Sequence, residues 1–330
     1  RMKRYLLLLA SALLLGSCST PEPEGEALIV ERIRMVQQLR AEAGRSWPAL
    51  LRPEYDVPLL YYTDSVCYAV NPTQHFLERM ACRPMHEEKG LNIRKCARPD
   101  SLPFHMQTIM SFDDSTRFDY RSPVLLCSSP ETTAQFVTGT DSDEAWALMA
   151  LHEYTHGFQL LHPAFLAEFE QYCLTFPQGP FRRLYQGVDW QRRLIDRENE
   201  ALKGALAAAD VAQRDSCIRL FLDTRADRRA RMLHYNGEVM TSAERLYEMM
   251  EGSARYVEAQ TGLRLGIYDM QKDTWLYDPA RTPYYYYATG YNLMRVLMLL
   301  GADTSRLFTE PGLGLGELLA ETFETQTQKQ

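Results

Sequence analysis

The feature that most constrains this chain is a pair of histidines one helical turn apart, His152 and His156, with Glu153 between them. Residues at positions i and i+4 lie on the same face of a helix, so both imidazoles can bind one tetrahedral zinc ion. Glu153 follows around the helix, where its carboxylate can reach a metal-bound water as a general base. The spacing therefore predicts a zinc site that still needs a third protein ligand.

The residues around this motif predict a buried helix over residues 142–162. Asp141 or Ser142 can cap its start, and no helix breaker precedes Gly157. Apolar side chains cover nearly every face of this helix: Trp146, Leu148, Met149, Leu151, Phe158, Leu160 and Leu161. Two histidines and a glutamate are costly in such a setting without a partner, which favours a metal site over a pair of hydrogen-bonded core histidines.

The start of the chain predicts export. Residues 1–4 are mostly basic and residues 6–15 form an apolar run that is too short for a final transmembrane helix, which is typical of a secretion signal. The sequence Leu15-Gly16-Ser17-Cys18 resembles a bacterial lipobox, which implies cleavage after residue 17 and a lipid on Cys18. The alternative is an ordinary cleaved signal in which Cys18 is incidental.

Residues 18–26 are expected to form the lipid anchor and a flexible acidic tether. This tether is similar to the acidic stretches that follow the lipidated cysteine in some surface lipoproteins of the Bacteroides group. Loss of residues 1–17 removes three basic side chains and changes the formal charge from −7 to −10, which argues against nucleic acid as a partner. We therefore expect a protein of the bacterial cell envelope, held at the outer membrane through its lipid alone and facing the periplasm or the cell surface.

The rest of the chain is expected to be α+β and to divide near residue 140. Residues 27–140 predict a helix over 27–44 and then strands near 57–62, 66–70, 106–112 and 124–127. The run over 122–139 could supply an edge strand to which a peptide adds. Residues 141–330 predict mostly helices, including 142–162, 163–174, 189–209, 211–231, 241–261, 283–300 and 314–323. The charged stretch 197–202 predicts a solvated helix face.

Six cysteines follow Cys18, and an even number in an exported protein suggests disulfides. Four of them precede residue 140 and two follow it. The simplest arrangement has two bridges in the first part and a third between Cys173 and Cys217, although the sequence leaves other pairings open. Zinc ligation by these cysteines is disfavoured, because no two of them are closely spaced.

The third zinc ligand is predicted from the segment Glu251-Gly252-Ser253-Ala254-Arg255-Tyr256. It resembles the Glu-Gly-x-Ala-x-Tyr segment of gluzincin metallopeptidases, such as the aminopeptidase-N-like enzymes, in which the glutamate completes a His-His-Glu zinc site. The resemblance implies a zincin-like core with Glu251 as the ligand, and Glu248 one turn earlier is the alternative. The connection from His156 is far longer than in those enzymes, which implies a helical insertion over about residues 163–235.

A tyrosine-rich stretch over residues 284–291 gives one further candidate. Such a cluster usually packs in a core or an interface. Gluzincins, however, often use a tyrosine hydroxyl to stabilise the oxyanion, and the resemblance makes Tyr287 the candidate for this role. It lies three residues before Gly290, where a neighbouring helix could approach closely.

Together these features predict a zinc metallopeptidase that hydrolyses a peptide or protein substrate in the cell envelope. Glu153 is expected to take a proton from the metal-bound water and to pass it to the leaving amine. No motif that would hold a free amino terminus is present, so the resemblance does not imply aminopeptidase activity. The alternative is a non-catalytic envelope lipoprotein, for binding or scaffolding, built on the same zincin core.

Overall fold

The computed structural model describes residues 25–110 and 122–328. The signal at residues 1–17 and the lipid anchor Cys18 lie outside the described residues, so both stay predictions. The chain divides into two compact units, the first comprising Arg1–Leu161 with Gln260–Ile267 and the second His162–Ala259 with Tyr268–Gln330. Within the described ranges, no helix combines the length and the apolar character needed to cross a membrane.

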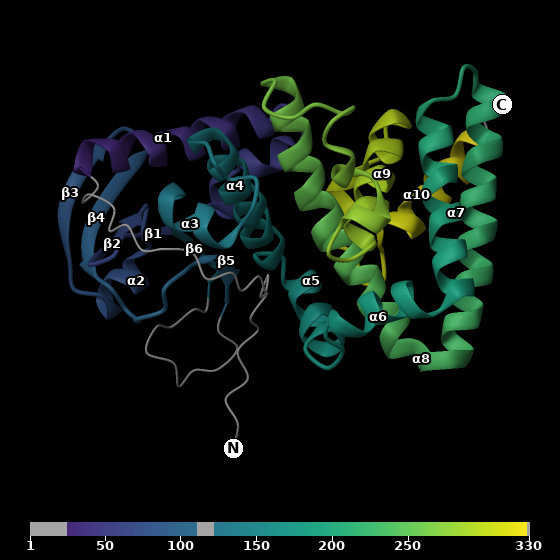
Figure 1. The fold of residues 1–330 in the computed structure, drawn as a ribbon, viewed down its shortest axis with the longest axis horizontal. Coiled ribbons are helices and arrows are strands. Elements are labelled where there is room, and N and C mark those ends of the chain that lie inside the picture. Colours follow the sequence, from purple (N-terminus) through teal and green to yellow (C-terminus); the bar gives the residue numbers. More distant parts are fainter. Residues whose placement is uncertain (1–24, 111–121, 329–330) are drawn as a thin grey trace. The chain divides into compact units, whose positions relative to one another are not determined.

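The first unit contains a six-stranded mixed sheet, so the predicted α+β class is confirmed (Figure 1). The strand order is β3-β4-β2-β1-β6-β5, and β1 pairs with β6 in parallel while all other pairs are antiparallel. The strands are β1 Leu59–Tyr62, β2 Val66–Val70, β3 Cys82–Glu88, β4 Leu91–Ala97, β5 Met106–Ile109 and β6 Val124–Ser128. The sequence missed the β3–β4 hairpin, because β3 is largely charged and exposed and has no apolar alternation.

The edge strand next to the histidine helix is β5, and the prediction that residues 122–139 supply it is wrong. Within that run, β6 lies between β1 and β5, and all five of its residues are buried. A short apolar run of this kind is typical of an interior strand. Helix α3 (Pro130–Phe136) follows it, because the Ser129 side chain accepts a hydrogen bond from Thr132 N and a proline occupies the first turn.

Helix α4 (Asp143–Leu160) carries the histidines and confirms the predicted helix, with Ser142 as its cap. It packs against α1 (Glu26–Ala43) and against β5 and β6. It therefore groups with the sheet, and the division between the units falls after Leu161 rather than near residue 140. The other helical segments of the first unit are α2 Gln74–Arg79 and the 3-10 turns Pro48–Leu51 and Pro53–Tyr55.

The second unit is helical. Its elements are α5 Pro163–Glu168, a π-helical turn Phe169–Cys173, α6 Gly179–Gly187, α7 Asp189–Leu206, α8 Val211–Arg264, α9 Tyr286–Leu299, α10 Leu315–Thr327 and the 3-10 turns Thr274–Leu276, Pro279–Arg281 and Thr304–Arg306. The two helices predicted over 211–231 and 241–261 are the arms of α8, which breaks at Gly237 with a φ of 77° that favours glycine. The predicted insertion over about 163–235 is helical and shares its unit with α9 and α10.

Of the two bridges predicted for the first part of the chain one is present, and the predicted bridge between Cys173 and Cys217 is wrong. Cys82 and Cys96 join β3 to β4. The Cys173–Cys217 bridge does not form, because Cys173 is buried beside Ala243 of α8 whereas Cys217 lies against Gly204 of α7.

A second bridge in the first part of the chain is prevented by the geometry of the sheet. Cys67 pairs in register with Tyr62, and Cys127 pairs with Tyr61. Consecutive residues of a strand point to opposite faces, so the two cysteines lie on opposite faces of the sheet.

Candidate metal centre

The three residues of the motif lie together on α4. Their ligand atoms are all within 4.8 Å of one another, and the imidazole ring centres of His152 and His156 are 4.8 Å apart. Both histidines are buried and Glu153 is half-buried. Within residues 25–110 and 122–328, this is the one group of three or more His, Cys, Asp or Glu side chains whose arrangement could hold a metal ion.

A hydrogen bond to Gln159 orients the second imidazole. His156 Nδ1 lies 3.0 Å from Gln159 Oε1, and Gln159 is fully buried. An amide oxygen can only accept, so this bond requires the proton on Nδ1 and puts the lone pair of the ring on Nε2. Metal-binding histidines are commonly fixed in this way through their other nitrogen. The arrangement therefore suits His156 as a metal ligand.

The edge strand β5 holds Glu153 by two hydrogen bonds from Thr108. The backbone N–H of Thr108 donates to Glu153 Oε2 at 2.8 Å, and the Thr108 hydroxyl donates to the Glu153 carbonyl oxygen. Both the carboxylate and its backbone are thus fixed at the end of the sheet. No sequence pattern predicts this role, because a single threonine in a predicted strand is not distinctive.

Close packing at Gly157 and Tyr154 sets the position of α4 against the segment before β1. A Cβ atom on Gly157 would lie 2.6 Å from Val57 Cγ1, so glycine is needed for this approach. The Tyr154 hydroxyl accepts from Val57 N at 3.2 Å and donates to Tyr55 O at 3.3 Å. Burial raises the pKa of Tyr154 to about 12, so the hydroxyl keeps its proton at neutral pH and remains a donor.

The first turn of α4 is held by Arg32 of α1. The Arg32 guanidinium donates to both carboxylate oxygens of Asp143, each at 3.0 Å, and also to Glu131 Oε2 at 3.0 Å. Such bidentate contacts combine charge with a fixed geometry. Both ends of the histidine helix are therefore tied to the first unit, which keeps its two imidazoles in a defined position.

Glu248 and Glu251, the two candidates for the third zinc ligand, have different hydrogen-bond partners in the second unit. Glu248 Oε2 and Oε1 accept from the two Nη atoms of Arg225 at 2.8 and 2.9 Å, and Oε1 also accepts from the Thr289 hydroxyl at 2.7 Å. Burial alone would raise the pKa of Glu248, but Arg225 and Thr289 outweigh it and hold that pKa below its usual value. Both oxygens of Glu248 are thus engaged within its own unit, which disfavours it as a metal ligand.

Glu251 has a different environment on the same helix. It is fully buried, and its Oε1 accepts from Gln178 Nε2 at 3.2 Å. Such a neutral amide donor can support a ligating carboxylate. Glu251 and the two histidines belong to different units, so their joint coordination of one ion stays a prediction.

Tyr287 lies in the first turn of α9, half-buried, with its ring stacked against Tyr284 and Tyr286. The close helix approach predicted at Gly290 is confirmed, because a Cβ atom there would lie 2.7 Å from Gly252 Cα on α8. Tyr287 therefore stands one turn before the crossing of α8 and α9. Its role toward an oxyanion stays a prediction.

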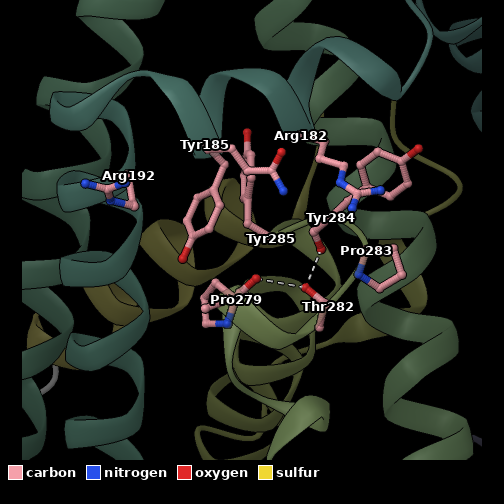
Figure 2. A pocket seen from close by; sticks show the side chains of 10 residues that line it. Arg182, Tyr185, Arg192, Pro279, Thr282, Pro283, Tyr284 and Tyr285 are labelled. Atoms are coloured by element: carbon pink, nitrogen blue, oxygen red, sulfur yellow. Dashed lines mark hydrogen bonds between the residues drawn. The ribbon is translucent and has the colours of Figure 1, made fainter.

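The second unit also has a pocket of about 230 Å³ (Figure 2). Its lining comes from α6, the start of α7 and the loop that leads into α9: Arg182, Tyr185, Gln186, Arg192, Pro279, Ala280, Thr282, Pro283, Tyr284 and Tyr285. The Thr282 hydroxyl lies within hydrogen-bond distance of the carbonyl oxygens of Pro279 and Tyr284, which shapes one wall. No histidine, cysteine or carboxylate lines this pocket, so it offers a metal ion no side-chain ligand of the usual kinds.

The assignment of this centre rests on the residues and their geometry. Two buried histidines and one carboxylate on α4 could hold a metal ion, with a threonine of β5 fixing the carboxylate. Comparison with known proteins adds no family to this description, since no protein-family model, no curated protein and no solved structure matches the chain.

Proposed function

We propose that this chain is a zinc-dependent metallopeptidase anchored in the bacterial cell envelope. The observation that carries the proposal is the convergence of His152, Glu153 and His156 on α4, with Glu153 held by the edge strand β5. Imidazole nitrogens and a carboxylate oxygen are ligands that zinc accepts, and the hydrogen bond of His156 to Gln159 presents Nε2 for binding. The donor set therefore fits zinc.

His152 and His156 would hold the ion, and the gluzincin resemblance supplies Glu251 as the third ligand. When bound, zinc lowers the pKa of a water molecule toward about 7 and polarises the scissile carbonyl. The capture of both oxygens of Glu248 by Arg225 and Thr289 supports the choice of Glu251.

Glu153 would act as the general base. Its carboxylate takes a proton from the attacking water and then gives this proton to the leaving amine. The Thr108 N–H donates a hydrogen bond to one oxygen of Glu153, which holds the carboxylate in place for this proton transfer. Tyr287 would donate its hydroxyl proton in a hydrogen bond to the oxyanion, as the same resemblance implies.

An extended peptide is the substrate form that the first unit suits. Among the described residues β5 is the last strand at its end of the sheet, and it directly contacts the helix that carries Glu153. Added strands pair with such edges through their backbones, which gives affinity with little dependence on side chains. This edge takes the role that the sequence had suggested for residues 122–139.

Metal analysis and one conservative variant test the proposal. The purified protein should contain close to one zinc per chain, and His152→Ala should lose it. Glu153→Gln should keep the zinc and the fold but lower kcat for peptide hydrolysis by about 10²–10⁴-fold, because an amide cannot accept the proton. Glu144→Gln, on an exposed position of the same helix, is the matched control and should keep full activity.

Three outcomes would contradict the proposal. Folded protein without metal would remove the zinc site. Zinc-loaded protein whose hydrolysis is unaffected by Glu153→Gln would show that the activity comes from elsewhere. A chain that binds zinc but cleaves none of a broad set of peptides would favour the non-catalytic envelope lipoprotein instead.

A further inference from the structure

Arg255 is a buried cation of the second unit whose hydrogen-bonding capacity is largely unused. It is 6% exposed, and its guanidinium carbon lies 4.4 Å from the ring centre of Trp275 and 5.3 Å from that of Tyr287. Its Nε and Nη1 atoms are buried, and neither has a hydrogen-bond partner among the described residues. Buried polar groups are nearly always hydrogen-bonded, so this arginine requires an explanation.

The other deeply buried arginines of the same unit make the contrast clear. Arg225 donates to Glu198 and to both oxygens of Glu248, and Arg228 donates to Glu198 and Glu244. These two guanidinium groups are saturated by carboxylates, which is how a structural buried charge is compensated. Arg255 lacks such saturation although it lies on the same helix.

The Glu258 carboxylate lies near Arg255 and compensates its charge only in part. Glu258 Oε2 lies 3.6 Å from Arg255 Nε, beyond hydrogen-bond distance. The other oxygen of Glu258 accepts from the Tyr268 hydroxyl at 2.7 Å. The charge of Arg255 is therefore balanced at a distance by Glu258 and by two aromatic rings, while the N–H groups of its Nε and Nη1 atoms have no acceptor among the described residues.

The position of Arg255 relates it to the proposed site. It lies four residues after Glu251 on α8, so the two side chains share one face of that helix. Its guanidinium also contacts the ring of Tyr287, the candidate for the oxyanion. A substrate group held by Arg255 would thus lie on the side of the second unit that presents both of these residues.

We propose that Arg255 binds a carboxylate of the substrate, supplied either by the C-terminus of a peptide or by an aspartate or glutamate side chain. The inference rests on the proposed function for its link to hydrolysis. A guanidinium matches a carboxylate with two parallel hydrogen bonds, and the rings of Trp275 and Tyr287 hold it in place before the ligand arrives. The preferred substrates are therefore peptides that carry a carboxylate.

Two pairs of peptides test the proposal and distinguish the two sources. The first pair is acetyl-pentaalanine with a free C-terminal carboxylate or a carboxamide. The second pair is acetyl-Ala-Ala-Glu-Ala-Ala-amide and the same peptide with Gln in place of Glu. Binding is measured by titration calorimetry on the full-length Glu153→Gln protein loaded with zinc, which prevents turnover. In at least one pair the carboxylate peptide should bind about 10- to 100-fold more tightly.

Three variants assign this preference to one side chain. Arg255→Met should abolish it, and Arg255→Lys should keep only part of it, because a lysine offers a point charge without the planar fork. Arg295→Met is the matched control: Arg295 lies in the same unit, stacks on Tyr291 and donates to Asn292 in its own helix, so its loss should leave the preference unchanged. If Arg255→Met does not fold, comparing Arg255→Lys with the parent protein decides whether Arg255 causes the preference for the carboxylate peptide.

The proposal is overturned if both members of each pair bind the parent protein equally or not detectably, or if an Arg255 variant keeps the full preference. These results are separable from a failure of the proposed function, because zinc content and turnover are measured independently on the protein with Glu153 intact. An Arg255-dependent preference in a chain without hydrolysis would leave a carboxylate-binding site in a non-catalytic protein. Hydrolysis without the preference would remove Arg255 alone.

Discussion

The histidine motif of the first unit and the buried arginines Arg225 and Arg228 of the second unit are arranged in opposite ways. In the second unit, Arg225 and Arg228 bond to three buried carboxylates, and Tyr285 donates to one of these, Glu244. The opposite charges there are paired with one another. In the first unit, the ligand atoms of the two histidines and Glu153 gather within 4.8 Å of one another instead.

This difference distinguishes buried ionisable groups that stabilise the fold from buried groups that can bind a ligand. Groups that saturate one another leave nothing for a ligand, and breaking such a pair mainly costs stability. Donor atoms that converge on one point are suited to a shared ligand such as a metal ion. By the same criterion, Arg255 differs from Arg225 and Arg228, because its Nε and Nη1 atoms have no hydrogen-bond partner among the described residues.

The largest expected effect follows from replacing Glu251. Glu251→Ala should lower zinc affinity by more than about 100-fold and abolish hydrolysis, since losing a residue that only hydrogen-bonds a metal ligand already costs about 10- to 100-fold. Chelator competition measures the affinity. Glu248→Ala is the matched control, because Glu248 is equally buried on the same helix but bound to Arg225. It should destabilise the fold while the folded protein keeps its zinc. Similar zinc loss in both variants would refute the distinction between the two carboxylates.

Breaking the buried charge network should cost stability without touching the metal. Arg228 Nε lies 2.5 Å from Glu198 Oε1 and Nη1 lies 2.7 Å from Glu244 Oε1, and all three side chains are buried. Arg228→Met leaves two carboxylates without this partner and should lower the free energy of unfolding by about 3–5 kcal/mol, measured by urea titration. Arg231→Met breaks an exposed pair with Asp227 and should change it by about 0.5 kcal/mol or less. Zinc loss from folded Arg228→Met protein would count against a purely structural role.

Removing the disulfide tests whether the stability of the first unit can fall without any change at its metal site. Cys82–Cys96 lies in β3 and β4, at the opposite end of the sheet order from β5. It closes a loop with a sequence separation of 14, so the double variant Cys82→Ser, Cys96→Ser should lose about 3 kcal/mol. Thermal unfolding measures this loss. Zinc affinity and kcat at a temperature where the variant is folded should stay at the parent values, and a parallel fall in both would show coupling across the sheet.

The smallest expected effect concerns Thr108 of β5 and the way it positions Glu153. Thr108→Val keeps the branched shape and the N–H bond to Glu153 Oε2 but removes the hydroxyl bond to the Glu153 carbonyl. We expect a loss of about 1 kcal/mol in stability and a fall in kcat of about fivefold, with unchanged zinc content. Thr108→Ser restores the hydroxyl and should recover most of the activity. If Thr108→Ser is as impaired as Thr108→Val, the methyl group rather than the hydroxyl positions Glu153.

The sequence by itself determined the features that depend on local geometry. The spacing of His152 and His156 puts both imidazoles on one face of a helix wherever that helix lies, and Ser142 caps it through its own backbone neighbours. The α+β class and most helix ranges follow from periodicity in the same way. Such rules involve residues a few positions apart, so they can be read without knowing the fold.

Only the tertiary structure decided which side chains meet across elements. Glu198, in the stretch expected to form a solvated helix face, is fully buried against Arg225 and Arg228. Thr108 reaches Glu153 because β5 lies beside α4. Glu248 is bound by Arg225 because the two arms of α8 belong to one unit and meet at this ion pair. Local periodicity fixes the face on which a side chain lies, but the partner it meets depends on how distant elements pack, and that packing is a property of the whole chain.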